Sequence, residues 1–144
     1  TRFGKAADFL EKIRQISGRE PILDIPGAEP IGPKKMFDIL LAAPCTGNTL
    51  AKLACGITAN AVTMAVKSHL RGQRPVVLAI STNDALSGSA ANIGKLLNRR
   101  HYYFVPFRQD DPVKKPTSLV ADFSQIPQTL FAALEGRQLQ PLLA

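Results

Sequence analysis

The stretch that most limits the possible folds is a short apolar run that passes through a small polar turn into a helical pattern. Residues 36–43 read Met-Phe-Asp-Ile-Leu-Leu-Ala-Ala, which favours a parallel strand covered on both faces. After the turn, apolar residues recur at helical spacing: Leu50, Leu53, Ala54, Ile57 and Ala61. Ligands of open α/β sheets bind at the carboxyl ends of such strands, so the turn is a candidate binding site.

The rest of the chain continues this alternation of helix and strand. Helices are predicted at residues 3–16, 90–98 and 126–134, and from residue 48 through 70 with interruptions at Gly56 and Asn60. Strands are predicted at residues 37–43, 75–80 and 102–105, with either a short strand or an extended connection at 21–25 and a short extended piece at 118–122. The order predicts an α/β domain in which helices cover both faces of a parallel sheet.

Composition limits the classes of function. The 144 residues fit one domain, and 45% of them are hydrophobic, which is enough for a single core. No apolar segment approaches the roughly 20 residues that span a bilayer, and the first residues lack the apolar core of a signal peptide, so we expect a cytoplasmic protein. The net charge of +7 is a feature that nucleic-acid-binding proteins often have. The basic residues are dispersed, however, and a cationic surface that attracts small dicarboxylates or phosphates explains the same charge.

Two polar clusters follow the two clearest strands. In the first, Thr46, Asn48 and Thr49 offer hydroxyls and an amide beside Gly47. These side chains either cap the following helix or contact a ligand, and the two roles are compatible. In the second, Ser81, Thr82, Asn83 and Asp84 follow the strand at residues 75–80. We expect both clusters at one edge of the sheet, in a shared pocket.

The first cluster also carries a family resemblance. Residues 44–57 read Pro-Cys-Thr-Gly-Asn-Thr-Leu-Ala-Lys-Leu-Ala-Cys-Gly-Ile. They resemble the Pro-Ala-Ser-Ala-Asn-Thr signature, and the Ala-Lys and Gly-Ile that follow it, in the flavoprotein family that contains the FMN-dependent cysteine decarboxylases. The resemblance implies a three-layer, flavodoxin-like or Rossmann-like domain over residues 1–144 and a bound FMN. In that family a strand and a phosphate-binding loop precede a segment like this one, so we expect this chain to lack them.

The resemblance also implies which residues form the site. Cofactor contacts would come from the two polar turns, at Pro44, Cys45, Thr46, Gly47, Asn48, Thr49, Ser81 and Thr82. Substrate contacts would come from Asn48 and Asn83. The decarboxylases carry Pro-x-Met-Asn where this chain has residues 80–83, and only Asn83 matches. Flavin prenyltransferases share a Pro-Cys-Ser turn but place an arginine after the next strand, where this chain has none. No catalytic residue is identified.

The whole chain is similar to one branch of the family, the flavoprotein-like subunits of a two-subunit enzyme of spore-forming bacteria. By that resemblance it would act with a nucleotide-binding partner subunit, which would hold NADP, in oxidising a dihydro or tetrahydro precursor to a pyridine dicarboxylate. A flavin would suit that oxidation. The alternative is a non-enzymatic partner that keeps the fold but has lost FMN. Decarboxylation and prenyl transfer are more distant alternatives.

Four further residues have structural interpretations. Cys45 and Cys55 are too few for a disulfide framework and are expected as free thiols, Cys45 a small buried hydrophobe and Cys55 in the core or a subunit interface. His69 and His101 are expected to be structural, and no metal site is expected.

Apolar residues on more than one face of the helix over residues 48–70 predict a homo-oligomer: Val62, Met64, Val66 and Leu70.

Overall fold

The centre of the fold is β2 (Val76–Thr82), which lies between β1 (Leu40–Cys45) and β3 (Tyr102–Phe104) in the computed structural model, where residues 4–143 are described. Both neighbours run parallel to β2. β3 pairs with the first half of β2, and β5 (Leu119–Ala121) pairs antiparallel with its last two residues, Ser81 and Thr82. β4 (Phe107–Arg108) completes the five-stranded sheet, antiparallel to β5.

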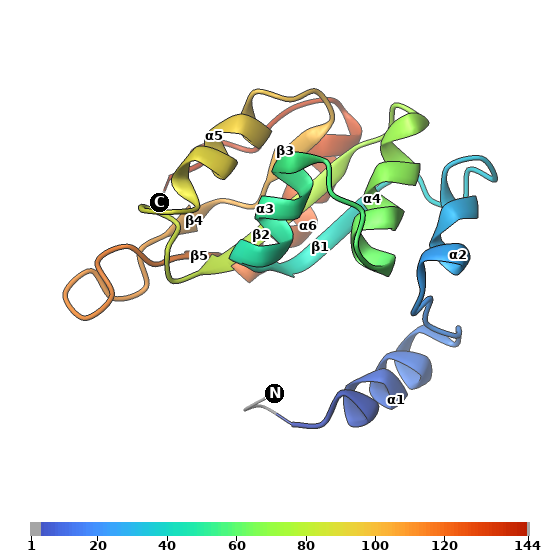
Figure 1. Cartoon of the computed structure of the whole chain (residues 1–144). Helices are drawn as coiled ribbons and strands as arrows, with labels where there is room; N and C mark the ends of the chain where they lie inside the picture. Colours follow the sequence, from blue (N-terminus) through green and yellow to red (C-terminus); the bar gives the residue numbers. More distant parts are fainter. Residues whose placement is uncertain (1–3, 144) are drawn as a thin grey trace.

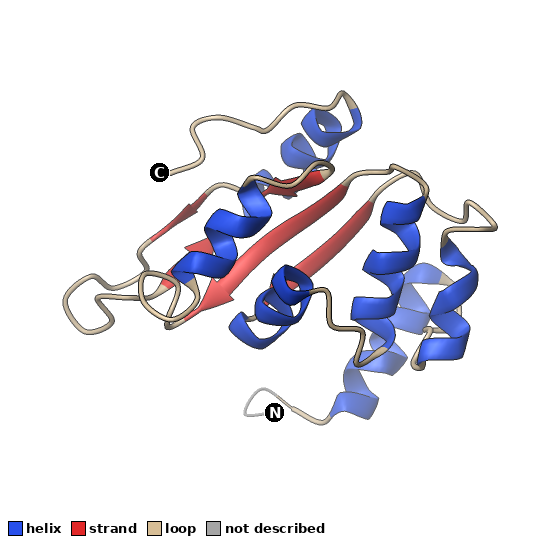
Figure 2. Ribbon diagram, turned by 45° about the horizontal axis from the view of Figure 1, so that its top comes forward, coloured by secondary structure: helices blue, strands red, loops and turns tan. Residues whose placement is uncertain are grey.

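Helices cover both faces of this sheet, as predicted for a three-layer α/β domain. α3 (Gly47–Cys55), α4 (Ala61–Arg71) and α5 (Ala90–Leu97) lie on one face, and α6 (Ile126–Leu134) lies on the other (Figures 1 and 2). α2 (Ile25–Ala28) and the 3-10 helix η1 (Glu29–Ile31) pack against α4, and the 3-10 helix η2 (Phe123–Gln125) precedes α6. The core lies around β2, where Val76, Val77, Leu78, Ala79 and Ile80 are completely buried.

Local chemistry explains why α3 and α4 are separate helices. Gly56 has a φ of 71°, a left-handed conformation that ends α3 and that glycine adopts without strain. Asn60 then begins α4 through a reciprocal capping box, in which its side chain accepts from the Thr63 backbone N–H and the Thr63 hydroxyl accepts from the Asn60 backbone N–H. The predicted interruption at these two residues is therefore confirmed.

The structure differs from the sequence-based expectations at two places and decides between two alternatives at a third. The first strand begins at Leu40 rather than at residue 37 and continues through Pro44. Residues 21–24 form the extended connection rather than the short strand, and Ile25 already begins α2, whose cap Asp24 accepts from the Gly27 N–H at 2.8 Å. The sheet is only mostly parallel, since β4 and β5 are antiparallel and β4 was too short to predict.

The first helix, α1 (Ala6–Ser17), projects away from the sheet (Figure 1). It has no buried residue, and its apolar side chains Phe9, Ile13 and Ile16 are 43%, 51% and 87% exposed. The helix was predicted from Phe3, which lies outside the described residues. Within residues 4–143, none of the helices combines the length and the apolar character needed to cross a membrane.

Candidate functional site

The two polar turns meet at the carboxyl ends of β1 and β2. Cys45 pairs with Ile80 in the parallel ladder, so the residues that follow each strand emerge side by side. Gly47 packs directly on the second turn, because a Cβ at this position would lie 2.7 Å from Thr82 Oγ1 and 3.0 Å from Asp84 Oδ1. The predicted adjacency of the two turns is confirmed.

In the first turn, the residue that caps α3 and the residue whose side-chain amide is unpaired are different. Thr46 is the N-cap of α3, and its hydroxyl oxygen accepts from the Thr49 backbone N–H at 3.5 Å. Asn48 lies in the first turn of α3 and is exposed, and within residues 4–143 its side chain has no hydrogen-bond partner. An unpaired amide beside free helix N–H groups is suited to a ligand oxygen.

In the second turn, the hydroxyls are organised by the carboxylate of Asp84, which was predicted in the polar cluster but not among the cofactor or substrate contacts. Thr82 donates to Asp84 Oδ1 at 2.6 Å, and Ser89 donates to both Asp84 oxygens at 3.0 Å. These hydrogen bonds, Thr82 first, lower the pKa of Asp84. Asp84 is therefore an ionised structural centre near neutral pH and is not suited to act as a proton donor there.

A polar cavity of about 410 Å³ lies beside the second turn. Ser81, Thr82 and Asn83 line one side, and Lys115, Ser118 and Asp110 line the other. This second side was missed from sequence, because the polar connection before β5 carries no strand pattern that would predict an antiparallel return beside β2. The Thr117 hydroxyl, which donates to the Asn83 carbonyl at 2.6 Å, ties the connection to the turn.

The cavity brings together one cation, one carboxylate and one unpaired buried hydroxyl. Lys115 Nζ lies 2.9 Å from Asp110 Oδ2. Ser118 is 1% exposed, and its hydroxyl has no hydrogen-bond partner within the described part of the chain. The dipole of this hydroxyl and the hydrogen bond from Lys115 both favour the ionised form of the Asp110 carboxyl. Together they lower the pKa of Asp110 to about 2. The Lys115 ammonium and the Ser118 hydroxyl are donors suited to the carboxylate of a ligand.

The cysteines and histidines have structural positions. Cys45 is completely buried, and desolvation raises the pKa of its thiol to about 12, so only its backbone can face a ligand. Cys55 is exposed at the end of α3 and is therefore not a core residue. His69 is buried, with Nε2 3.1 Å from the Pro75 carbonyl and a pKa lowered by burial. His101 Nε2 lies 3.0 Å from Gln73 Oε1. The described residues contain no cluster of His, Cys, Asp and Glu that could hold a metal ion.

Comparison with known families and sequences agrees with the fold and the turn signature. The family model described as Flavoprotein matches residues 3–125. The B subunit of dipicolinate synthase of Bacillus subtilis (strain 168) is 48% identical over 143 residues, which are 99% of this chain and 72% of that protein.

Solved structures give the same result in three dimensions. The crystal structure of the B subunit of dipicolinate synthase from Bacillus halodurans C matches all of this chain and 74% of its own chain, with a TM-score of 0.93 and 45% identity. The crystal structure of an FMN-dependent cysteine decarboxylase, SpaF, matches 86% of this chain and 71% of its own, with a TM-score of 0.64. At 24% identity, the second match shows a shared fold alone.

Proposed function

The chain belongs to the Flavoprotein family, and on that premise we propose that it is the flavoprotein-like B subunit of a dipicolinate synthase. In this proposal it acts with the A subunit of dipicolinate synthase in the cytoplasm of the mother cell of a sporulating bacterium. The reaction is the oxidation of a dihydro- or tetrahydrodipicolinate precursor to dipicolinate, and NADP is held by the A subunit. The observation that carries the proposal is the 48% identity to a protein of that name over 99% of this chain.

An FMN would lie against the two polar turns, and the residues there fit it. The N-terminus of α3 presents free backbone N–H groups and the unpaired Asn48 amide, and Gly47 lets it lie close against the second turn. Thr46, Thr49, Ser81 and Thr82 add hydroxyls, while Pro44 and Cys45 contribute backbone. When bound, the flavin would accept a hydride equivalent from the substrate. The residues of this chain would hold and orient it.

The dicarboxylate substrate would extend into the polar cavity beside the second turn. Asn83 and the Ser118 hydroxyl would donate to one carboxylate, and Lys115 would balance its charge in competition with Asp110. Asn48, which lies on the adjacent turn, would contact both the substrate and the flavin.

One observation favours the alternative of a non-enzymatic partner of the A subunit. Within the described part of the site, both carboxylates, Asp84 and Asp110, have lowered pKa values. Neither is suited to gain and lose a proton near neutral pH. The catalytic base would then lie on the partner, and this chain would stabilise or regulate it.

The test is flavin binding. We expect the purified protein to bind FMN with a visible absorption spectrum, and Asn48→Asp to weaken binding of FMN or dicarboxylate about tenfold, equivalent to about 1.4 kcal/mol. The reason is that the new carboxylate repels an anionic ligand, while an acid in the first turn of a helix preserves the fold. Gln128→Glu, the same change in the first turn of α6 across the sheet, is the matched control.

Fluorescence titration and a thermal melt on each sample separate binding from folding. Loss of FMN affinity in Asn48→Asp with an unchanged melt supports the site. Equal affinity for FMN in Asn48→Asp and Gln128→Glu would show that Asn48 does not contact the flavin. A protein that binds no FMN but raises the activity of the A subunit would favour the non-enzymatic alternative.

A further inference from the structure

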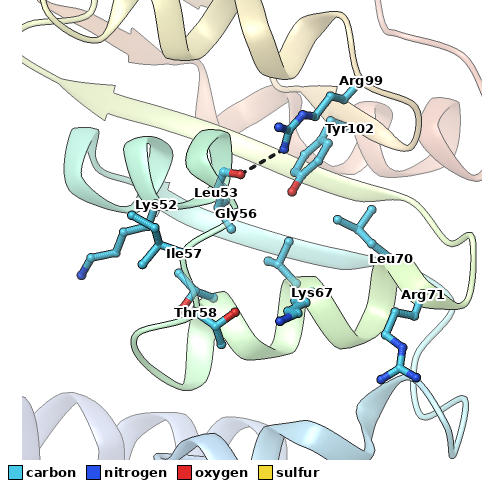
Figure 3. Close-up of a pocket in the computed structure, with 12 residues that line it drawn as sticks. Lys52, Leu53, Gly56, Ile57, Thr58, Lys67, Leu70, Arg71, Arg99 and Tyr102 are labelled. Atoms are coloured by element: carbon cyan, nitrogen blue, oxygen red, sulfur yellow. Dashed lines mark hydrogen bonds between the residues drawn. The ribbon is translucent and has the colours of Figure 1, made fainter.

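A second cavity, of about 320 Å³, lies at the other end of α3 (Figure 3). Its walls are mainly apolar, with Leu53 and Ile57 contributed by the end of α3 and the turn after it, and Val66 and Leu70 contributed by α4. Tyr102, the first residue of β3, closes it from the sheet side. The volume suits a ligand of the size of a small aromatic ring system.

Four cations surround this apolar space: Lys52, Lys67, Arg71 and Arg99. No acidic residue is among the residues that line the cavity. Within residues 4–143, Lys52, Lys67 and Arg71 have no carboxylate partner, since the recorded ion pairs involve other side chains. Uncompensated charge of one sign around a concave apolar surface concentrates the field and attracts ligands of the opposite charge.

Arg99 also fixes the shape of the cavity. Its guanidinium donates to the carbonyls of Leu53 and Ala54 at 3.2 and 3.0 Å, which are among the last carbonyls of α3. Figure 3 shows the bond to Leu53. Such an arginine satisfies helix-end carbonyls that would otherwise lack partners. One wall of the cavity is therefore held in place before any ligand binds.

A tyrosine hydroxyl points into the same space. Tyr102 is 8% exposed, and in Figure 3 its oxygen is directed toward Gly56, at the centre of the lining residues. Within the described residues no hydrogen bond to this hydroxyl is recorded. The hydroxyl is therefore free to donate to a ligand oxygen in the cavity.

We propose that this cavity binds a small amphipathic anion, namely an apolar ring or short chain that bears a carboxylate or a similar acidic group. The apolar part lies against Leu53, Val66 and Leu70, and the anionic group accepts from Tyr102 and is attracted by Lys67 and Arg71. The site is separate from the two polar turns. Tyr102 pairs with Val76, at the start of β2, whereas the turns follow the carboxyl ends of the strands.

The test uses 1-naphthoate as the probe and the uncharged 1-naphthamide as its control, with binding followed by amide NMR shifts. A probe of this size should bind with a Kd of about 1 mM or tighter. We expect saturable shifts at Gly56, Leu70 and Tyr102, weaker binding of the amide, and loss of affinity as salt is raised.

Two sets of variants assign the binding to this cavity. Lys67→Gln/Arg71→Gln should weaken the naphthoate about tenfold, whereas Lys5→Gln/Lys114→Gln, which removes the same charge elsewhere, should not. Tyr102→Phe deletes only the hydroxyl, and should weaken the acid more than the amide; it also serves as the test if the double variant unfolds. Equal binding of acid and amide, equal losses in both double variants, or shifts centred on Ser81 and Asn83 would overturn the proposal.

Discussion

Gly47 determines how closely the two turns of the candidate site approach each other. A methyl group there would meet Thr82, Asp84 and Ser89 at 2.7, 3.0 and 3.1 Å, so at least one hydrogen bond of the Asp84 cluster must break to admit it. We predict that Gly47→Ala lowers the free energy of unfolding by about 1–2 kcal/mol. Urea unfolding of the purified chain measures this directly.

Gly94 provides the matched control for this prediction. It lies inside α5, and a Cβ there would meet nothing within 4 Å. Gly94→Ala should therefore raise stability by about 0.5–1 kcal/mol through helix propensity alone. If Gly47→Ala is stabilised as much as Gly94→Ala, the second turn can move aside without cost. Gly47 would then not determine the distance between the two turns.

The sequence alone does not say which residue caps α3. Thr46, Asn48 and Thr49 are all residue types that cap helices. The choice depends on where the backbone leaves the extended conformation, which is at Thr46, with φ −76° and ψ 162°. That one-residue difference places Asn48 inside the first turn, where its amide is unpaired.

Among the elements, β3 is short and is completed on its outer side by a side chain rather than by a strand. Gln138 Oε1 accepts from the Phe104 N–H at 2.8 Å, and Gln138 Nε2 donates to the Phe104 carbonyl at 2.7 Å. We predict that Gln138→Glu costs about 1–3 kcal/mol in the free energy of unfolding at pH 7, because it removes the donor and places a charge beside a carbonyl. The measurement is urea unfolding at pH 4 and pH 7.

The pH dependence has a definite sign. The new carboxyl is penalised when charged, so its pKa is raised in the folded protein, and the deficit should be larger at pH 7 than at pH 4. Gln140→Glu is the control, since Gln140 uses only its oxygen, which accepts from the Leu142 N–H at 3.0 Å. Equal losses in the two variants would show that the pairing of Gln138 with Phe104 contributes nothing specific.

Elements with strong periodicity could be predicted from sequence, and those that depend on distant partners could not. β2, α5 and α6 were found within about two residues, because a continuous apolar run or helical spacing marks each one. β4 has two residues and exists only through its pairing with β5. The cavity side formed by Lys115 and Ser118 was missed for the same reason. Its position depends on the antiparallel pairing of β5 with β2, which joins segments distant in the sequence.

For the molecule as a whole, the alternation of helices and strands was sufficient to predict a three-layer α/β domain, but not which surfaces stay uncovered. Of the apolar residues on which the oligomer prediction rests, Val66 is buried in the core, while Val62 is 47% exposed. Val62 lines an apolar groove of about 220 Å³ with Leu40 and Leu41 of β1. Within the described sheet, β1 pairs only with β2, so its other edge is open.

These surfaces, together with the apolar stripe of α1, lead us to predict that the chain forms a homo-oligomer. Phe9, Ile13 and Ile16 recur at helical spacing, are 43%, 51% and 87% exposed, and lie on a helix that projects from the sheet (Figure 1). An exposed apolar stripe of this kind is typical of a surface that another chain covers. Light scattering at micromolar concentration should therefore report a multiple of 15.6 kDa.

Variants on α1 test which surface is responsible, because no residue of this helix is buried and its substitution leaves the core intact. Ile13→Glu/Ile16→Glu should lower the measured mass, since two charges would have to be buried in the contact. Ala7→Glu/Gln15→Glu adds the same charge away from the stripe and should leave the mass unchanged. A monomer in the unmodified chain would contradict the oligomer. An oligomer that survives Ile13→Glu/Ile16→Glu would move the contact to the groove at Val62.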